Sequence, residues 1–135
     1  ALSDAGAHLI YMCDAGFGLH FLSHWVRARG DFDIVEGIRR LTSHPADLYG
    51  IQNRGRIAEG WAADITVFDA ETVGPGPAEM RFDLPGGAGR VYGESIGVEH
   101  VIVNGVPAVR NNVALDARPG TLLRSGRDTE TVTAQ

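Results

Sequence analysis

The chain has 135 residues, of which 44% are hydrophobic and 21% charged, and its formal net charge is −5. This length suits one compact domain and is too short for a large enzyme barrel, which takes about 250 residues. All 12 basic residues are arginines spread along the chain, without the basic stripe that binds phosphate backbones, so we expect no nucleic-acid partner.

Membrane insertion and secretion are not expected either. The longest apolar stretches are well short of the roughly 20 residues that a membrane-spanning helix needs, and no charged segment followed by an apolar core indicates a secretory signal. The single cysteine, Cys13, cannot form an internal disulfide, and we expect its thiol to be inert and at least partly buried. A reducing, cytoplasmic location is the simplest expectation.

The first ten residues, ALSDAGAHLI, have the pattern of a buried strand that ends by delivering a carboxylate to a pocket. Asp4 is the carboxylate, and His8 follows in the next loop. Local pattern leaves other roles open, because Asp before Ala-Gly is common at turns and helix caps and a lone His is usually a hydrogen-bonding residue. Residues 11–17 show no period and predict a loop.

The segment GLHFLSHWVRARG predicts an amphipathic helix that ends at Gly30. Its apolar residues recur at helical spacing, at Leu19, Leu22 and Val26. His20 and His24 stand four apart, as paired zinc ligands do, but the glutamate that the zincin motif requires after the first histidine is Phe21 here. Packing therefore explains this helix better than metal binding.

Two shorter helices are expected next. Asp33, with Glu36 three residues later, predicts the N-cap of a second helix. Ser43 predicts the N-cap of a short third helix, and Gly50 predicts its end. Helices are thus expected to occupy most of the chain between residues 18 and 50.

From about residue 53 the pattern becomes that of β-structure. ADITVF, residues 63–68, alternates in the period of a strand, and Asp64 at its start is expected to make a structural hydrogen bond to the preceding turn. Residues 71–90 are rich in Gly and Pro and predict a long loop. Its glycines do not indicate a phosphate-binding loop, because no helix follows them.

A β-hairpin is predicted in VEHVIVNGVPAV, because Asn104-Gly105 between β-branched runs favours a type I′ turn. Residues 53–124 therefore form a β-rich module, and the polar tail from Ser125 is expected to be frayed. The opening strand lacks a nearby partner, and about four strands make a thin sandwich. Both parts of the chain look unfinished.

Four stretches in this order, SDAGAH, IRRLTSHPADLYG, RGRIAEGWAADITVFD and VEHVIVNGVPAV, resemble the carboxyl-terminal part of the amidohydrolase superfamily. Within it, the N-acyl-D-amino-acid deacylases, or D-aminoacylases, are the most similar. The resemblance extends to about Arg124. Its most specific piece, G-R-I-A-x-G-x-x-A-D-x-x-V-F-D, identifies the superfamily well and the substrate poorly.

The resemblance implies an α/β fold that belongs to a longer protein. Residues 1–52 would be the last strand, loop and helices of a metal-dependent (β/α)₈ TIM barrel, and residues 53–124 the carboxyl-terminal part of a small composite β-sandwich. Residues 125–135 would be a disordered tail. Because a barrel strand is buried by its neighbours, residues 1–17 are expected to be disordered or paired with the rest of the barrel or with a homo-oligomeric partner.

The resemblance also implies a metal-dependent hydrolase of non-peptide C–N bonds that deacylates N-acyl-D-amino acids. Asp4 would be the aspartate that accepts a proton from the Zn²⁺-bound water and passes it to the leaving amine, and it could also contact the metal. His8 would line the substrate pocket. The family's other metal ligands match no part of this sequence and are expected upstream, so the chain alone should be inactive.

Two alternatives stay open. A cyclic-amide hydrolase of the dihydropyrimidinase or allantoinase type would have a lysine-bridged two-metal centre in the upstream sequence. A non-catalytic binding or assembly module would form a stable monomer without a large apolar patch, whereas dimerisation or strand swapping would favour a divided barrel.

Overall fold

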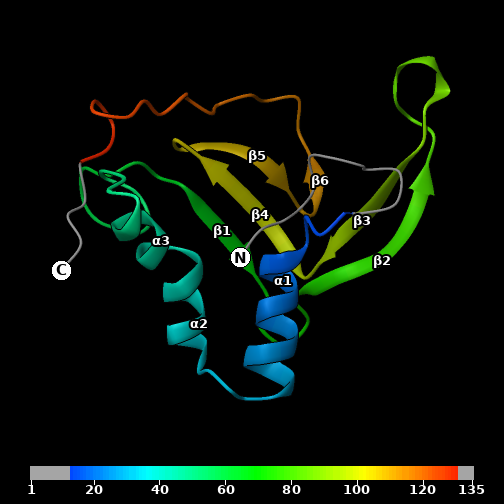
Figure 1. Cartoon of the computed structure of the whole chain (residues 1–135), viewed down its shortest axis with the longest axis horizontal. Coiled ribbons are helices and arrows are strands. Elements are labelled where there is room, and N and C mark those ends of the chain that lie inside the picture. The colour runs from blue at the N-terminus through cyan, green and yellow to red at the C-terminus, as the bar shows by residue number, and fades with distance from the viewer. Residues whose placement is uncertain (1–12, 131–135) are drawn as a thin grey trace. The chain divides into compact units, whose positions relative to one another are not determined.

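The computed structural model describes residues 13–130 of the chain, leaving out residues 1–12 and 131–135 (Figure 1). It combines helices and strands, consistent with the predicted α/β class. The described chain forms two compact units, the first made of residues 13–32 and 69–97 and the second of residues 33–68 and 98–130. These units do not test the predicted boundary between barrel and sandwich, which remains a prediction. Within this part of the chain, no helix has both the length and the apolar character needed to cross a membrane.

The helix predicted before Gly30 is confirmed in the first unit. It consists of α1 (Phe17–His20) and the directly following π-helix η1 (Phe21–Ala28) (Figure 1). The wider π turn is seen where the Arg29 amide donates to the His24 carbonyl, five residues back, at 2.9 Å. Gly30 ends the helix with a φ of 68°, a left-handed conformation that glycine adopts without a steric penalty.

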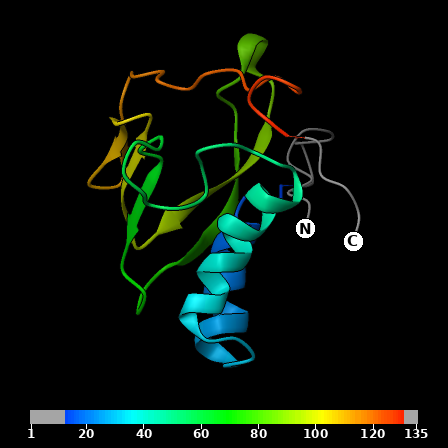
Figure 2. The ribbon, with the colours of Figure 1, turned by 90° about the vertical axis from the view of Figure 1, so that its left-hand side faces the viewer.

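The long loop predicted at residues 71–90 is wrong, because most of this segment belongs to a β-hairpin. In it, β2 (Gly74–Arg81) pairs antiparallel with β3 (Arg90–Ile96), and the two strands lie side by side in Figure 1 and Figure 2. Each strand of a two-stranded sheet has an unpaired edge, where a proline's missing N–H removes no hydrogen bond. The register shifts between Pro75 and Ala78, where the prolines of β2 lie.

A tight turn at residues 69–73 leads into this hairpin in the first unit. The carboxylate of Asp69 accepts hydrogen bonds from the Glu71 amide and the Thr72 hydroxyl at 2.9 and 2.8 Å. Val73, which is 1% exposed, follows, and its carbonyl accepts a hydrogen bond from Arg27 of η1 at 2.7 Å. The turn is thus held by a side chain from the helix.

In the second unit, α2 (Ile34–Leu41) begins as predicted. The side chain of Asp33 accepts a hydrogen bond from the Glu36 amide at 2.8 Å, so Asp33 is the N-cap.

The cap predicted for the third helix is wrong by one residue. Thr42 occupies the N-cap position of α3 (Ser43–Leu48), and Ser43 is its first helical residue and is buried. Since Thr42 alone separates α2 from α3, it caps both helix ends, and its hydroxyl donates back to the Ile38 carbonyl at 2.7 Å. Gly50 has a φ of 62° just beyond the helix, as its predicted end requires.

A four-stranded antiparallel sheet completes the second unit, with the strand order β1-β4-β5-β6. Its strands are β1 (Ile65–Phe68), β4 (Val98–Val103), β5 (Val106–Arg110) and β6 (Val113–Ala114). The strand predicted at residues 63–68 is confirmed from Ile65 onward. The predicted Asn104-Gly105 hairpin joins β4 to β5, with positive φ values of 48° and 79° at its two turn residues.

The segment from Ser125 to Glu130 differs from the frayed tail that was predicted. Thr129 forms a bridge with Ile51, and the Glu130 amide donates to the Gly50 carbonyl at 2.8 Å. Backbone hydrogen bonds therefore hold these residues against the chain that follows α3.

Candidate functional site

The two residues predicted to act in catalysis, Asp4 and His8, lie outside the described residues. Their positions therefore remain predictions. The described chain that follows them, residues 13–20, forms one wall of a pocket in the first unit. The pocket wall therefore includes the described segment that is nearest in the sequence to Asp4 and His8.

The pocket has a volume of about 670 Å³ and lies between residues 13–20 and the hairpin β2–β3. The lining residues with polar side chains are Cys13, Asp14, His20, Tyr92, Glu94 and Ser95. Asp14 was not singled out from the sequence, and the last three were missed as candidates because the Gly- and Pro-rich segment before them predicted a loop. Val91, Tyr92 and Ile96 favour strands and were the signal that could have indicated this wall.

Arg81 fixes the hairpin wall of the pocket. Its guanidinium donates to Glu94 and to Glu79, both at 2.7 Å, and lies over the ring of Tyr92 at 3.9 Å from the centroid. The hydrogen bonds to Glu94 and then Glu79 raise the pKa of Arg81. The wall thus offers a positioned phenol and a charge-compensated carboxylate, groups that can orient a polar ligand by hydrogen bonding.

His20 and His24 stack on one another, with ring centroids 5.1 Å apart and an interplanar angle of 11°. His24 also packs edge-on against Trp25 at 5.1 Å. Cys13 is a half-buried free thiol. Between residues 13 and 130, the structure contains no group of three or more His, Cys, Asp or Glu side chains that could hold a metal ion. These residues by themselves therefore do not fit a metal centre.

Asp64 has a structural role in the second unit, as predicted, although its partners come from elsewhere than the preceding turn. Its carboxylate forms an ion pair with Arg54 and accepts a hydrogen bond from the Asn104 amide at 2.8 Å. Burial acts to raise the pKa of Asp64, but the hydrogen bonds from Asn104 and Arg54 and the Arg54 charge outweigh it, so the pKa is lowered. Asp64 thereby joins the start of β1 to the β4–β5 turn.

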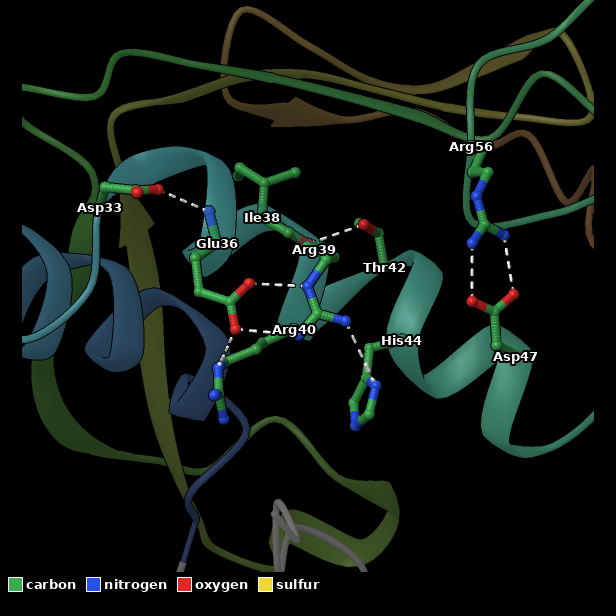
Figure 3. A network of polar contacts seen from close by, with 9 residues as sticks. All are labelled: Asp33, Glu36, Ile38, Arg39, Arg40, Thr42, His44, Asp47 and Arg56. Atoms are coloured by element: carbon green, nitrogen blue, oxygen red, sulfur yellow. Dashed lines mark hydrogen bonds and ion pairs between the residues drawn. The ribbon is translucent and has the colours of Figure 1, made fainter. Parts of the chain in front are cut away.

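A second polar network lies on α2 and α3 (Figure 3). Glu36 accepts hydrogen bonds from Arg39 at 2.6 Å and from Arg40 at 2.7 Å. Nearby, Arg56 and Asp47 form a bidentate ion pair. The hydrogen bond from Arg39, followed by that from Arg40, lowers the pKa of Glu36 to about 2. Because its arginines and Asp47 are exposed and Glu36 is only partly buried, the network supports helix stability and offers no enclosed site.

The substitution Glu36→Gln should change how stability depends on pH. A lowered folded-state pKa means that the stabilisation by this carboxylate is complete above its ordinary pKa of 4.5 and is lost as the pH falls through about 2. We expect the free energies of unfolding of the wild type and the variant, measured with urea, to differ near neutral pH and to converge over this window.

Glu59→Gln is the matched control, because it removes one exposed carboxylate of the same unit outside this network. Wild-type and Glu36→Gln curves that stay parallel from pH 4.5 down to about 2 would contradict the role given to Glu36.

Comparisons with known proteins give consistent matches. The model of the amidohydrolase family matches residues 7–109, a range that includes His8 and begins after Asp4. The N-acyl-D-glutamate deacylase of Alcaligenes xylosoxydans xylosoxydans is 37% identical over 103 residues, which cover 76% of this chain and 19% of that protein. The D-aminoacylase of the same organism is 28% identical over 102 residues, with the same coverage of both chains. The chain thus spans about a fifth of the length of these curated relatives. No solved structure matches it.

Proposed function

The chain belongs to the amidohydrolase family, and from this membership we propose that it is part of an enzyme that hydrolyses the amide bond of N-acyl-D-amino acids. The observation that carries the proposal is the 37% identity to an N-acyl-D-glutamate deacylase over 103 residues. The second relative, a D-aminoacylase, supports the same substrate class. The first substrate to test is therefore an N-acylated acidic D-amino acid.

The proposal places residues 1–52 at the carboxyl-terminal end of a (β/α)₈ barrel and residues 53–124 in a β-sandwich, with residues 125–135 as a tail. The distribution of elements supports this division. Among the described residues, the helices α1, η1, α2 and α3 end before residue 52, and the strands lie between residues 65 and 114, with only the short 3-10 helix η2 (Pro85–Gly87) among them. Such a barrel would bring its catalytic groups to the carboxyl ends of its strands.

In this proposal the enzyme depends on a metal ion, with Zn²⁺ as the first candidate. A zinc ion would polarise the scissile carbonyl and lower the pKa of a bound water to about 7. Since residues 13–130 hold no group of three or more potential ligands, further ligands would come from outside this range, and Asp4 could be one of them.

Asp4 would act as the general base. Its carboxylate would accept a proton from the attacking water while the new C–O bond forms at the acyl carbon. It would then deliver this proton to the amine nitrogen while the C–N bond breaks, releasing a carboxylic acid and a D-amino acid. His8 would lie in the loop after the strand and contact the substrate.

An assay of the full-length protein tests the proposal. We expect release of glutamate from N-acetyl-D-glutamate and much slower hydrolysis of the L-enantiomer. Dialysis against a chelator should abolish the activity, and added Zn²⁺ should restore it. No turnover of any N-acyl-D-amino acid, together with hydrolysis of dihydrouracil, would overturn the proposal in favour of a cyclic-amide hydrolase.

The 135-residue chain assayed alone under the same conditions is expected to be inactive, because the family resemblance places the main metal ligands upstream of this sequence. Circular dichroism of the same sample would verify that it is folded. Turnover by the folded chain alone would contradict the placement of the main metal ligands outside it.

A further inference from the structure

Asn104 and Gly105 form the turn between β4 and β5. Asparagine followed by glycine is the dipeptide in which deamidation is fastest, because glycine has no side chain to shield its backbone nitrogen. We propose that this pair is a latent deamidation site, which hydrogen bonds to Arg54, Ala63 and Pro119 hold unreactive in the folded protein. The proposal does not depend on the proposed enzymatic activity.

The reaction needs only water. The backbone nitrogen of Gly105 attacks Cγ of Asn104, a new N–Cγ bond forms, and the Cγ–Nδ2 bond breaks. The nitrogen leaves as ammonia, with the proton that Gly105 has lost. One water then opens the resulting succinimide at either carbonyl, which yields aspartate or isoaspartate, and nothing is oxidised or reduced.

The attacking nitrogen is engaged in the folded protein. The Gly105 amide donates a hydrogen bond to the Ala63 carbonyl at 2.9 Å. Attack requires this nitrogen to lose its proton, and the hydrogen bond to a neutral carbonyl does not assist that loss. The Asn104 amide, one residue earlier, is held in turn by the Asp64 carboxylate at 2.8 Å. The backbone on both sides of the reacting bond is therefore fixed.

The side chain under attack is held from both ends. Its Oδ1 accepts a hydrogen bond from Arg54 at 2.7 Å, and its Nδ2 donates to the Pro119 carbonyl at 2.7 Å. Both hydrogen bonds are partly buried. Closure of the five-membered ring moves Cγ onto the backbone nitrogen, so these hydrogen bonds must be given up before the bond can form.

Arg54 could in principle act in the opposite direction. A cation at Oδ1 stabilises the negative charge that develops there during attack, as donors do in an oxyanion hole. This help is available only if the side chain can reach Gly105 while it keeps the Arg54 contact. The simultaneous hydrogen bond from Nδ2 to Pro119 opposes that movement, so restraint is the dominant effect.

Deamidation would undo the same contacts. A carboxylate at position 104 cannot donate to the Pro119 carbonyl, and the two oxygens would repel each other. An isoaspartate would also lengthen the backbone of a two-residue turn by one carbon. Either product should detach the segment around Pro119 from the β4–β5 hairpin.

Incubation of the full-length protein at mildly alkaline pH, once native and once unfolded in guanidinium chloride, tests the proposal. Peptide mass spectrometry would follow aspartate and isoaspartate at position 104 over time. We expect the native rate to be about 100-fold lower than the unfolded rate, the factor that corresponds to giving up about three hydrogen bonds of typical net strength. Comparable rates in the two states would overturn the proposal.

The variant Arg54→Ala removes the hydrogen bond to Oδ1 of Asn104, together with the Arg54–Asp64 ion pair. We expect faster deamidation at position 104 in native Arg54→Ala than in the native wild type. Arg56→Ala is the matched control, because it also removes a paired arginine, but the partner of Arg56 is Asp47 and not Asn104. If folded Arg54→Ala deamidates no faster than Arg56→Ala, Arg54 does not restrain Asn104. If Arg54→Ala fails to fold, the wild-type comparison still decides the main proposal.

Discussion

Replacing Asp4 by Asn should lower kcat for N-acyl-D-amino-acid hydrolysis by about 100- to 10,000-fold in the full-length protein, the range typical of a general acid–base residue. The asparagine keeps the size of the side chain but cannot accept and return the proton. Because substrate binding does not require that transfer, KM should change little. Steady-state kinetics with N-acetyl-D-glutamate measure both constants.

A matched control makes this prediction specific. Asp116→Asn, which neutralises an exposed aspartate far along the chain, should keep wild-type kinetics. An Asp4→Asn enzyme with activity within a few-fold of the wild type would exclude Asp4 as the general base.

Gly97→Ala should destabilise the first unit by about 3 kcal/mol, from overpacking together with a left-handed backbone. Gly97 has a φ of 71°, and a Cβ placed there would lie 2.6 Å from the Val73 nitrogen and 2.8 Å from the Val73 Cα. These are backbone atoms of the turn that Asp69 and Arg27 hold, so they cannot move without breaking its hydrogen bonds. Chemical unfolding followed by circular dichroism would measure the loss.

Gly30→Ala is the matched control for this substitution. Gly30 belongs to the same unit and has nearly the same φ, 68°, but a Cβ there meets nothing within 4 Å. It should therefore cost only the backbone strain, about 1–2 kcal/mol. Equal losses in the two variants would mean that the close approach to Val73 contributes nothing.

The elements predicted best are those whose cause lies within a few residues. The helix before Gly30, the Asp33 cap and the Asn104-Gly105 turn each depend on contacts or backbone angles within one turn of chain. The Ser43 cap was misplaced by one residue because the end of α2 also determines which residue begins α3. Local sequence patterns thus predict a helix end correctly unless one residue lies at the ends of two helices.

The hairpin β2–β3 was missed for a different reason. The glycines and prolines of β2 by themselves disfavour a strand, but hydrogen-bonded pairing with β3 outweighs that preference. The pocket wall that Tyr92 and Glu94 form, with Arg81 behind it, was missed along with the hairpin.

The amino-acid sequence by itself determined the family, because the order and spacing of its motifs can be recognised without knowing any contact. It also determined the helices and the tight turn. Only the tertiary structure decided which distant groups meet. Arg54, Asp64 and Asn104 form one network although 40 residues separate the last two, because antiparallel pairing of β1 with β4 brings their ends together. Hydrogen bonds of that kind depend on the register between strands, and no local pattern specifies that register.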